Sequence, residues 1–268
     1  MTTPPEEWLK TGMGRSTQDS IVVGGLDLAS EIMGEMSLAE LAFLLASGRT
    51  PSAAESRLFN AVLVSLADHG LTPTALAARF TYTGAPESLQ GAIAAGLLGA
   101  GSVFLGPVED TARFLGSILA DSRSDADAAL RNAAGVAVER TIAERKRVPG
   151  LGHPIHKEID PRTPRLYQLA DETNLAGPHL RVLEYVAAAH REATGKSLPI
   201  NGAGAAGAVV SDLGFPPSTA RGFALLARTA GLIGHLAEEV RNPLGMRLWR
   251  EIDERASRAS GTDSTRFP

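Results

Sequence analysis

Residues 148–162 constrain the fold more than any other part of this sequence, and they read Val-Pro-Gly-Leu-Gly-His-Pro-Ile-His-Lys-Glu-Ile-Asp-Pro-Arg. Glycine and proline before His153 oppose a helix and leave backbone N–H groups available to a ligand. Asp160-Pro161 marks a boundary, because the residue before proline is disfavoured in the α region. Helix-like residues resume over 165–172. We therefore expect a short loop between helices that carries His153 and Arg162, and such loops are a usual position for chemistry.

Apolar residues at helical spacing occupy most of the chain on both sides of this loop. Ser37 and Glu40 form a capping-box pattern at the start of one such segment, and Gly48 ends it. The segments expected to be helical are 37–47, 51–66, 72–83, 89–100, 112–120, 126–147, 164–174, 179–193 and 220–239. Residues 89–100 are apolar on every side, which predicts a buried helix. Residues 21–29 read as a short β-rich piece, and the sequence as a whole predicts an all-α fold.

The composition narrows the function classes. The chain has 268 residues, of which 44% are hydrophobic and 21% charged, as is ordinary for a globular protein of one large or two smaller domains. A net charge of −4 offers no electrostatic footprint for nucleic acid, and the absence of cysteine excludes disulfides and thiolate chemistry. No signal-peptide pattern and no apolar run of about 18 residues is present. We expect a cytoplasmic protein that does not act at a membrane.

The motif in residues 148–162 resembles the signature of the citrate synthase superfamily, in which V-P-G-x-G-H runs into K-x-x-D-P-R. The resemblance implies that His153 binds the keto or hydroxyl oxygen of an oxaloacetate-derived group and that Arg162 binds a carboxylate. His156 and Lys157 are then assigned to a phosphate of coenzyme A, which is a thioester substrate and not a permanently bound cofactor. The loop backbone is expected to contact the adenine of coenzyme A, at Val148, Gly150, Leu151 and Gly152.

Asp68-His69-Gly70 follows the expected end of a helix. The resemblance places a second oxaloacetate-binding histidine there, which makes His69 the second expected catalytic residue. The alternative is a histidine favoured by the helix dipole, with Gly70 as the cap. Residues 145–147, Arg-Lys-Arg, either complement a helix C-terminus or face the phosphates of coenzyme A, and these two interpretations are compatible.

Residues 227–239 resemble the family's S-R-x-x-G-x-x-A-H-x-x-E segment. The resemblance implies that Arg228 binds a substrate carboxylate. It also implies that Arg241 reaches the site of a partner subunit. His235 is expected to be a packed, hydrogen-bonded helix residue. Asn201 matches the asparagine of the family's P-x-N-V-D motif and is assigned to substrate binding.

Two catalytic groups of the family are missing from this sequence. Gly202-Ala203 stand where the family has Val-Asp, so Ala203 replaces the aspartate that removes the α-proton of acetyl-CoA. The histidine that binds the thioester oxygen is absent from the segment between Phe104 and Gly106. The carboxylates of Glu109 and Asp110 follow shortly after and are candidates to replace one of these groups.

The resemblance covers roughly residues 21–250. The residues of its motifs are most similar to those of compact proteins classed as citryl-CoA lyases. It implies a homodimer with an active site in the cleft between two helical domains. The large domain is expected to comprise residues 21–150 and 226–250, and the small domain residues 151–225. A flexible N-terminus is expected over residues 1–20 and a frayed C-terminal tail from residue 251 to 268.

The expected activity is cleavage of a 3-hydroxyacyl-CoA, such as citryl-CoA, into acetyl-CoA and a 2-oxo acid such as oxaloacetate. Two alternatives stay open. The first is a citrate synthase-type condensation of an acyl-CoA with a 2-oxo acid, and the second is non-catalytic binding of acyl-CoA esters or of dicarboxylates and tricarboxylates.

Two further patterns are weaker. Gly202, Gly204 and Gly207 satisfy G-x-G-x-x-G, but a dinucleotide site needs a preceding strand and a βαβ unit, and helices surround this segment. His153-x-x-His156 has the spacing of two metal ligands, but Pro154 interrupts it and no third ligand is evident. We therefore expect neither a nicotinamide cofactor nor a metal.

Overall fold

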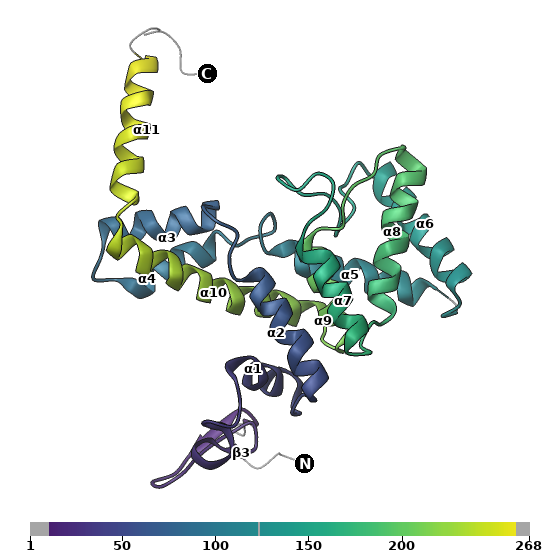
Figure 1. The fold of residues 1–268 in the computed structure, drawn as a ribbon, viewed down its shortest axis with the longest axis horizontal. Coiled ribbons are helices and arrows are strands. Elements are labelled where there is room, and N and C mark those ends of the chain that lie inside the picture. The colour runs from purple at the N-terminus through teal and green to yellow at the C-terminus, as the bar shows by residue number, and fades with distance from the viewer. Residues whose placement is uncertain (1–10, 123, 261–268) are drawn as a thin grey trace, which may run out of the picture.

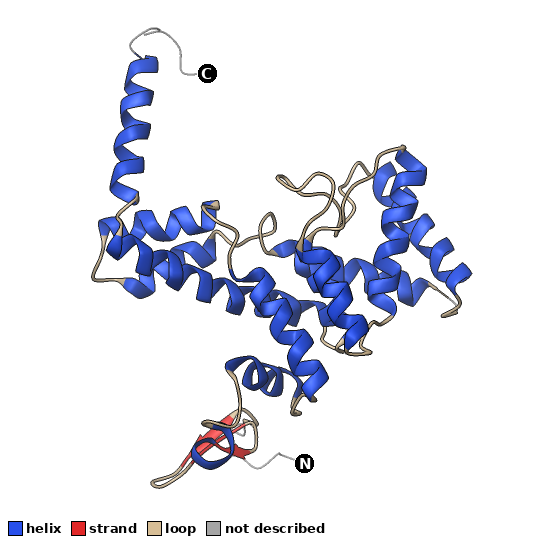
Figure 2. Cartoon of the chain, viewed as in Figure 1, coloured by secondary structure: helices blue, strands red, loops and turns tan. Residues whose placement is uncertain are grey.

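The computed structural model describes residues 11–122 and 124–260, and almost all of its elements are helices (Figures 1 and 2). The all-α fold predicted from the sequence is confirmed. In chain order the elements are β1 (Gly14–Ser16), β2 (Ile21–Val23), β3 (Leu26–Asp27), the π-helix η2 (Leu28–Ile32), α1 (Leu38–Ser47), α2 (Ala53–Ala67), α3 (Pro73–Gly84), α4 (Leu89–Leu98), α5 (Gly106–Asp121), α6 (Asp127–Ala143), α7 (Arg162–Glu172), α8 (Pro178–Thr194), α9 (Gly202–Asp212), α10 (Pro217–Arg241) and α11 (Gly245–Ser260).

A small antiparallel sheet forms the N-terminal part of the described chain. Its strands follow in the order β1-β2-β3, with Gly14 opposite Val23 and Val22 opposite Asp27. The backbone N–H of Thr17 donates to the carbonyl of Ser20 over 2.8 Å and closes the first turn. Residues 14–16 of the expected flexible segment are thus paired in a sheet, and the flexibility of the segment stays a prediction. Residues 1–10 lie outside the described residues.

Local capping explains where the first helices begin. The side chain of Ser37 accepts from the N–H of Glu40 and the side chain of Glu40 accepts from the N–H of Ser37, and Ser52 and Glu55 repeat this reciprocal pair at α2. Each pair satisfies two backbone donors that a helix leaves open at its N-terminus. Gly48 ends α1 in the left-handed conformation. These boundaries agree with those expected from the sequence.

Two helix boundaries differ from the expectation. Helix α5 begins at Gly106, so its first turn includes Pro107 and Glu109. Helix α6 ends at Ala143, and Arg145 follows with a φ of 55°. The basic residues 145–147 therefore follow the helix directly and do not form its last turn, where the sequence had predicted them.

Helix α10 runs through the middle of the molecule and joins its two ends (Figure 1). It packs against α3 and α4 at one end and against α2, α5 and α9 further along. The main core contains four phenylalanine rings with neighbouring centroids 4.7–5.9 Å apart, from Phe43, Phe59, Phe215 and Phe223. A smaller cluster joins α3, α4 and α10 through Ala78, Ala92, Leu232 and Leu236. The division into two domains stays a prediction.

Helices α4 and α11 expose apolar residues. Leu98 at the end of α4 is 86% exposed, so the expectation of a completely buried helix is wrong. Helix α11 projects from the body (Figure 1) and exposes Trp249 and Ile252. It continues to residue 260, so the chain does not fray at residue 251, and residues 261–268 lie outside the described part. Within the described residues, no helix combines the length and apolarity needed to cross a membrane.

Candidate active site

The glycines of the 148–162 loop allow it to lie against helix α9. Gly150 and Gly152 have φ values of +83° and +77°, in the left-handed region that favours glycine. A Cβ on Gly204 would lie 2.6 Å from the Cα of Gly150, so only glycine permits this approach of α9 to the loop. The N–H of Asn201 donates to the carbonyl of Gly150 over 2.9 Å, and the N–H of Gly152 donates to the carbonyl of Pro199 over 2.8 Å. The loop therefore has a backbone path fixed by the segment before α9.

Asn201 joins the loop to α9 through its side chain. Its Oδ1 accepts from the N–H of Gly204 over 2.8 Å and caps α9, while its Nδ2 donates to the carbonyl of Gly152 over 2.8 Å. Both ends of the amide thus have protein partners. This residue, which the sequence assigned to substrate binding, supports the loop that carries His153.

His153 is held by the loop that follows it. Its Nδ1 accepts from the backbone N–H groups of Ile155 and His156, over 3.2 and 3.1 Å. A nitrogen that accepts carries no proton, so the neutral ring presents Nε2–H as a donor. Burial lowers the pKa of His153 from its ordinary value, and the neighbouring His156, His69 and Arg162 add to this effect against the attraction of Asp160. The geometry and the lowered pKa favour a neutral imidazole that donates from Nε2.

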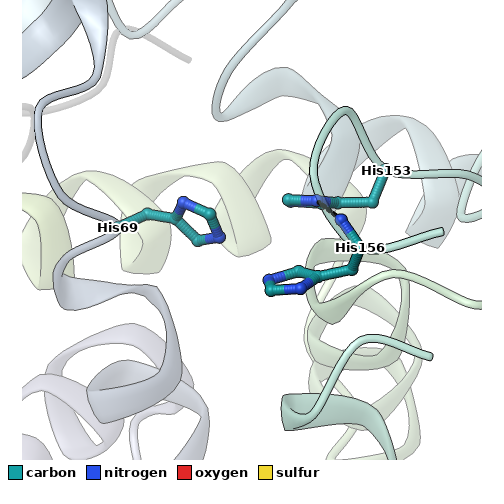
Figure 3. Close-up of side chains that lie close together, drawn as sticks. All are labelled: His69, His153 and His156. Carbon is teal, nitrogen blue, oxygen red and sulfur yellow. Dashed lines mark hydrogen bonds between the residues drawn. The ribbon is translucent and has the colours of Figure 1, made fainter. Parts of the chain in front are cut away.

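Three imidazole rings converge at this point, from two distant segments (Figure 3). The rings of His153 and His156 are stacked with centroids 4.5 Å apart. The ring of His69 lies 5.0 Å from that of His153 and 5.6 Å from that of His156. Helix α2 ends at Ala67 with Asp68 as its C-cap, so His69 lies in the following loop and faces the other two rings. This position favours the ligand-binding interpretation of His69 over a residue at a helix end.

His156 is the ring whose place the sequence did not indicate. It had been assigned with Lys157 to a phosphate of coenzyme A, but its imidazole lies with the other two histidines. Lys157 is directed back to the loop, where its Nζ donates to the carbonyl of His153 over 3.2 Å. The only sequence signal for His156 was its distance of three residues from His153.

Arg162 is the first residue of α7 and is tied to Asp160. Its Nε donates to Oδ1 over 2.9 Å and its Nη2 to Oδ2 over 2.7 Å, and Asp160 is completely buried. Burial alone would raise the pKa of Asp160. The hydrogen bonds from Arg162 and from the N–H of Gly202 outweigh burial and hold this pKa well below its usual range. Among the described residues, Nη1 has one hydrogen-bond partner, the carbonyl of Ser65 at 3.4 Å, which leaves it able to bind a ligand.

Arg228 is a buried cation whose hydrogen bonds are incomplete. It is 7% exposed and its Nη2 donates to the carbonyl of Leu66 over 3.2 Å. Its Nε is buried and has no hydrogen-bond partner among residues 11–122 and 124–260. Burial lowers its pKa, and nearby Arg162 lowers it further against the attraction of Asp68. Unpaired buried donors are rare and costly in proteins. An anionic ligand bound by both arginines would accept a hydrogen bond from the Nε of Arg228 and would reduce the repulsion between the two guanidinium groups.

The remaining expected residues lie elsewhere or have other partners. Arg241 is exposed at the end of α10, and its proposed role in a partner subunit stays a prediction. Glu109 on α5 forms ion pairs with Arg113 and Arg221, at 2.7 and 3.9 Å. Burial and the charge of Glu109 raise the pKa of Asp110. Ala203 lies half-buried in α9, at the position where the resemblance leads one to expect aspartate.

The three histidines could hold a metal ion by spacing alone, because their ligand nitrogens all lie within 4.8 Å of one another. His69 thus supplies the third ring that the sequence did not reveal. However, a histidine coordinates a metal through an unprotonated nitrogen, and Nδ1 of His153 is already occupied by two backbone donors. The arrangement favours a carbonyl or alkoxide oxygen, which accepts hydrogen bonds, over a cation.

Comparison with known proteins shows the family of this chain. A family model described as the citrate synthase C-terminal domain matches residues 21–251. The chain belongs to the citrate synthase family. It is therefore a member of a family of lyase- and synthase-type enzymes.

Among solved structures, the citryl-CoA lyase of Hydrogenobacter thermophilus is 34% identical, with 87% of each chain covered and a TM-score of 0.78. An ATP citrate lyase of Methanosaeta concilii, solved in complex with (3S)-citryl-CoA, is 20% identical with a TM-score of 0.73. The match covers 90% of this chain and 40% of that one, and at this identity it concerns the fold alone.

Curated relatives are longer than this chain. A citrate synthase-like protein of Aspergillus oryzae is 28% identical over 220 residues, which are 78% of this chain and 46% of the relative. A probable ATP-citrate synthase of Dictyostelium discoideum is 24% identical, with 85% of this chain and 38% of the relative covered. The chain thus spans less than half the length of these two relatives.

Proposed function

We propose that this protein is a citryl-CoA lyase-like enzyme, which cleaves a 3-hydroxyacyl-CoA into an acyl-CoA and a 2-oxo dicarboxylate. The observation that carries the proposal is a pair of arginines that donate to the adjacent carbonyls of Ser65 and Leu66, just before the loop of His69, with the Nε of Arg228 buried and without a hydrogen-bond partner among the described residues. Arginines suit carboxylates because they donate planar, charge-assisted hydrogen bonds. The similarity to a citryl-CoA lyase at 34% identity supports the same substrate class.

The reaction proposed for citryl-CoA begins at its hydroxyl group. His69 accepts the hydroxyl proton, and Nε2–H of His153 donates to the alkoxide oxygen as negative charge develops there. The bond between the alkoxide carbon and the carbon next to the thioester breaks, and its electron pair forms the enolate of acetyl-CoA. The alkoxide carbon becomes the keto carbon of oxaloacetate. Water or a carboxylic acid then returns a proton to the enolate carbon.

Two departures from the family motif favour the cleavage direction. Condensation must first remove the α-proton of acetyl-CoA, and Ala203 cannot act as the base for that step. Cleavage generates the enolate without such a base and needs only a proton donor afterwards. Asp110, near the start of α5, stays the candidate donor that the sequence suggested. We therefore place condensation second to cleavage.

A non-catalytic binder of coenzyme A esters and dicarboxylates is the second candidate function. It is favoured by the same two departures, because the aspartate and the thioester-binding histidine are both missing. In this case the arginines and the histidines would still bind the ligands. The two functions differ in turnover and not in affinity.

The test is an assay of the purified protein with citryl-CoA, in which release of acetyl-CoA and of oxaloacetate is followed separately. We expect release, and we expect the His153→Ala variant to lose it while still binding coenzyme A esters. His190→Gln is a matched control, because the ring of His190 bonds the carbonyl of Lys196 and is not part of the imidazole cluster. Binding of citryl-CoA without release would support the binder and contradict the lyase.

We also propose that the chain forms a homodimer. Large apolar side chains stay exposed on several elements, among them Val64 on α2, Leu98 on α4 and Ile233 on α10, with exposed fractions of 67%, 86% and 51%. Large apolar side chains exposed to this degree are candidates for a contact with another protein chain. Light scattering should give twice the mass of the chain, and a Leu98→Glu variant should shift it toward the monomer. A monomeric mass for the unmodified protein would contradict this proposal.

A further inference from the structure

One face of helix α10 meets three consecutive residues at the end of α2. Arg228, Gly231 and His235 are three and four residues apart, which places them on the same side of a helix. Arg228 donates to the carbonyl of Leu66, and a Cβ on Gly231 would lie 2.0 Å from the carbonyl oxygen of Ala67. The Nε2 of His235 lies 2.8 Å from Oδ1 of Asp68. The next residue along the chain is His69, so α10 determines where the loop that carries His69 begins.

The proton position on His235 is fixed by Arg79. The Nε and Nη2 of Arg79 lie 3.3 and 3.0 Å from Nδ1 of His235. Because a guanidinium can only donate, Nδ1 must accept, and the neutral ring carries its proton on Nε2. Nε2–H therefore donates to the carboxylate of Asp68. The contact with Arg79 alone therefore determines this tautomer of His235.

Arg79 itself has no freedom to turn away. It is 1% exposed, its Nη1 donates to Oε2 of Glu239 over 2.7 Å, and its Nη2 also pairs with Glu238. The other oxygen of Glu239 accepts from the N–H groups of Leu244 and Gly245, where α11 begins. The arrangement thus links the start of α11, through Glu239 and Arg79, to His235.

Asp68 connects His235 to the loop that carries His69. Its Oδ1 accepts from His235, and its Oδ2 accepts from the N–H of Gly70 over 2.9 Å. Burial would raise the pKa of Asp68, but the N–H groups of Gly70 and His69 and the bond from His235 outweigh it and lower this pKa. An ionised carboxylate thus spans the loop on both sides of His69.

We infer that His235 is a positioning residue for His69, acting through the carboxylate of Asp68. It holds the His69 ring at the distance from His153 and His156 that the substrate oxygen requires. The expected effect of His235 on catalysis rests on the proposed function. The contacts that support the positioning of His69 lie within the protein and do not depend on the identity of the substrate.

The consequence is that a change at His235 should act only through His69. The test compares His235→Leu, His69→Ala and the double variant. His190→Gln is the matched control, because His190 is also a helix histidine but bonds the carbonyl of Lys196 within its own region. In the proposed lyase assay, we expect His235→Leu to lower kcat/KM by about tenfold or more, since small displacements of catalytic groups have effects of this size.

The double-variant cycle separates positioning from general loss of structure. If His235 acts through His69, His235→Leu should change kcat/KM by less than about twofold in the His69→Ala background. His235→Gln should recover part of the activity, because its amide offers a donor to Asp68 and an acceptor to Arg79. Equal losses in both backgrounds would overturn the inference.

A measurement without substrate keeps the inference testable if the lyase proposal fails. The imidazole resonances of His69 and the amide exchange of Gly70, followed by NMR in the ligand-free protein, should change in His235→Leu and recover in His235→Gln. They should not change in His190→Gln. If His235→Leu does not fold, Asp68→Asn provides the same comparison, because it keeps an acceptor but loses the charge. Unchanged His69 and Gly70 signals in these variants would overturn the inference whatever the enzyme does.

Discussion

The space beside Gly202 decides where Arg162 can lie. A Cβ built on Gly202 would lie 2.3 Å from Nε, 2.5 Å from Cζ and 2.9 Å from Nη2 of Arg162. The guanidinium can move away only by giving up its hydrogen bonds to Asp160, of 2.9 and 2.7 Å. These distances exclude any residue with a Cβ at position 202 while Arg162 keeps its present place, although the family motif has valine there. We therefore expect Gly202→Ala to displace Arg162.

The size of the effect follows from the bonds that are lost. Two charge-assisted hydrogen bonds at about 1.5 kcal/mol each give a loss of about 3 kcal/mol. The better helix propensity of alanine returns at most about 1 kcal/mol at the first turn of α9. We expect Gly202→Ala to lower the free energy of unfolding by about 2 kcal/mol. Asp160 keeps the N–H of Gly202 as a partner, which limits the loss.

Urea unfolding measures the stability change, and the lyase assay measures its consequence for carboxylate binding. Gly135→Ala is the matched control, because this glycine also lies in a helix but has nothing within 4 Å of the added methyl group. The control should gain about 0.5–1 kcal/mol. The reasoning is refuted if Gly202→Ala is as stable as the unmodified protein and keeps its KM for citryl-CoA.

Three other perturbations test the site. Because burial lowers the pKa of His153 below its ordinary value of 6.5, its imidazole resonances in NMR should titrate with a midpoint below 6.5. A midpoint above 6.5 would contradict the neutral His153 of the site. Replacing Arg228 by Gln should weaken oxaloacetate binding in calorimetry by about 10- to 100-fold, since a charged hydrogen bond contributes about 1.5–3 kcal/mol, and unchanged affinity would remove Arg228 from the site. Dialysis against EDTA should leave the cleavage rate unchanged, because His153 offers a donor and not a lone pair; a loss that Zn²⁺ or Co²⁺ restores would show that the histidines bind a metal.

Interactions between residues that are close along the chain could be predicted from the sequence. The capping pairs of Ser37 with Glu40 and of Ser52 with Glu55 are local, and the helices begin where these residues predict. The glycines and prolines of residues 148–152 oppose a helix by their own backbone chemistry, so the loop was predictable as well. The resemblance, carried by the same short motifs, led to the family that the comparisons confirm.

The resemblance already implied that His69 and His153 act on the same group of the substrate. The position of His156 beside them could not be predicted, because it depends on how the loop before α7 packs against the end of α2. The same holds for Asn201, whose assignment to substrate binding rested on a motif, while its amide supports the loop. Sequence spacing indicates which side chains share one helix face, but it contains no information on which face of another helix they meet. That choice is made by close packing over the whole core, which is why the role of His235 emerged only from the contacts of Arg79 and Asp68.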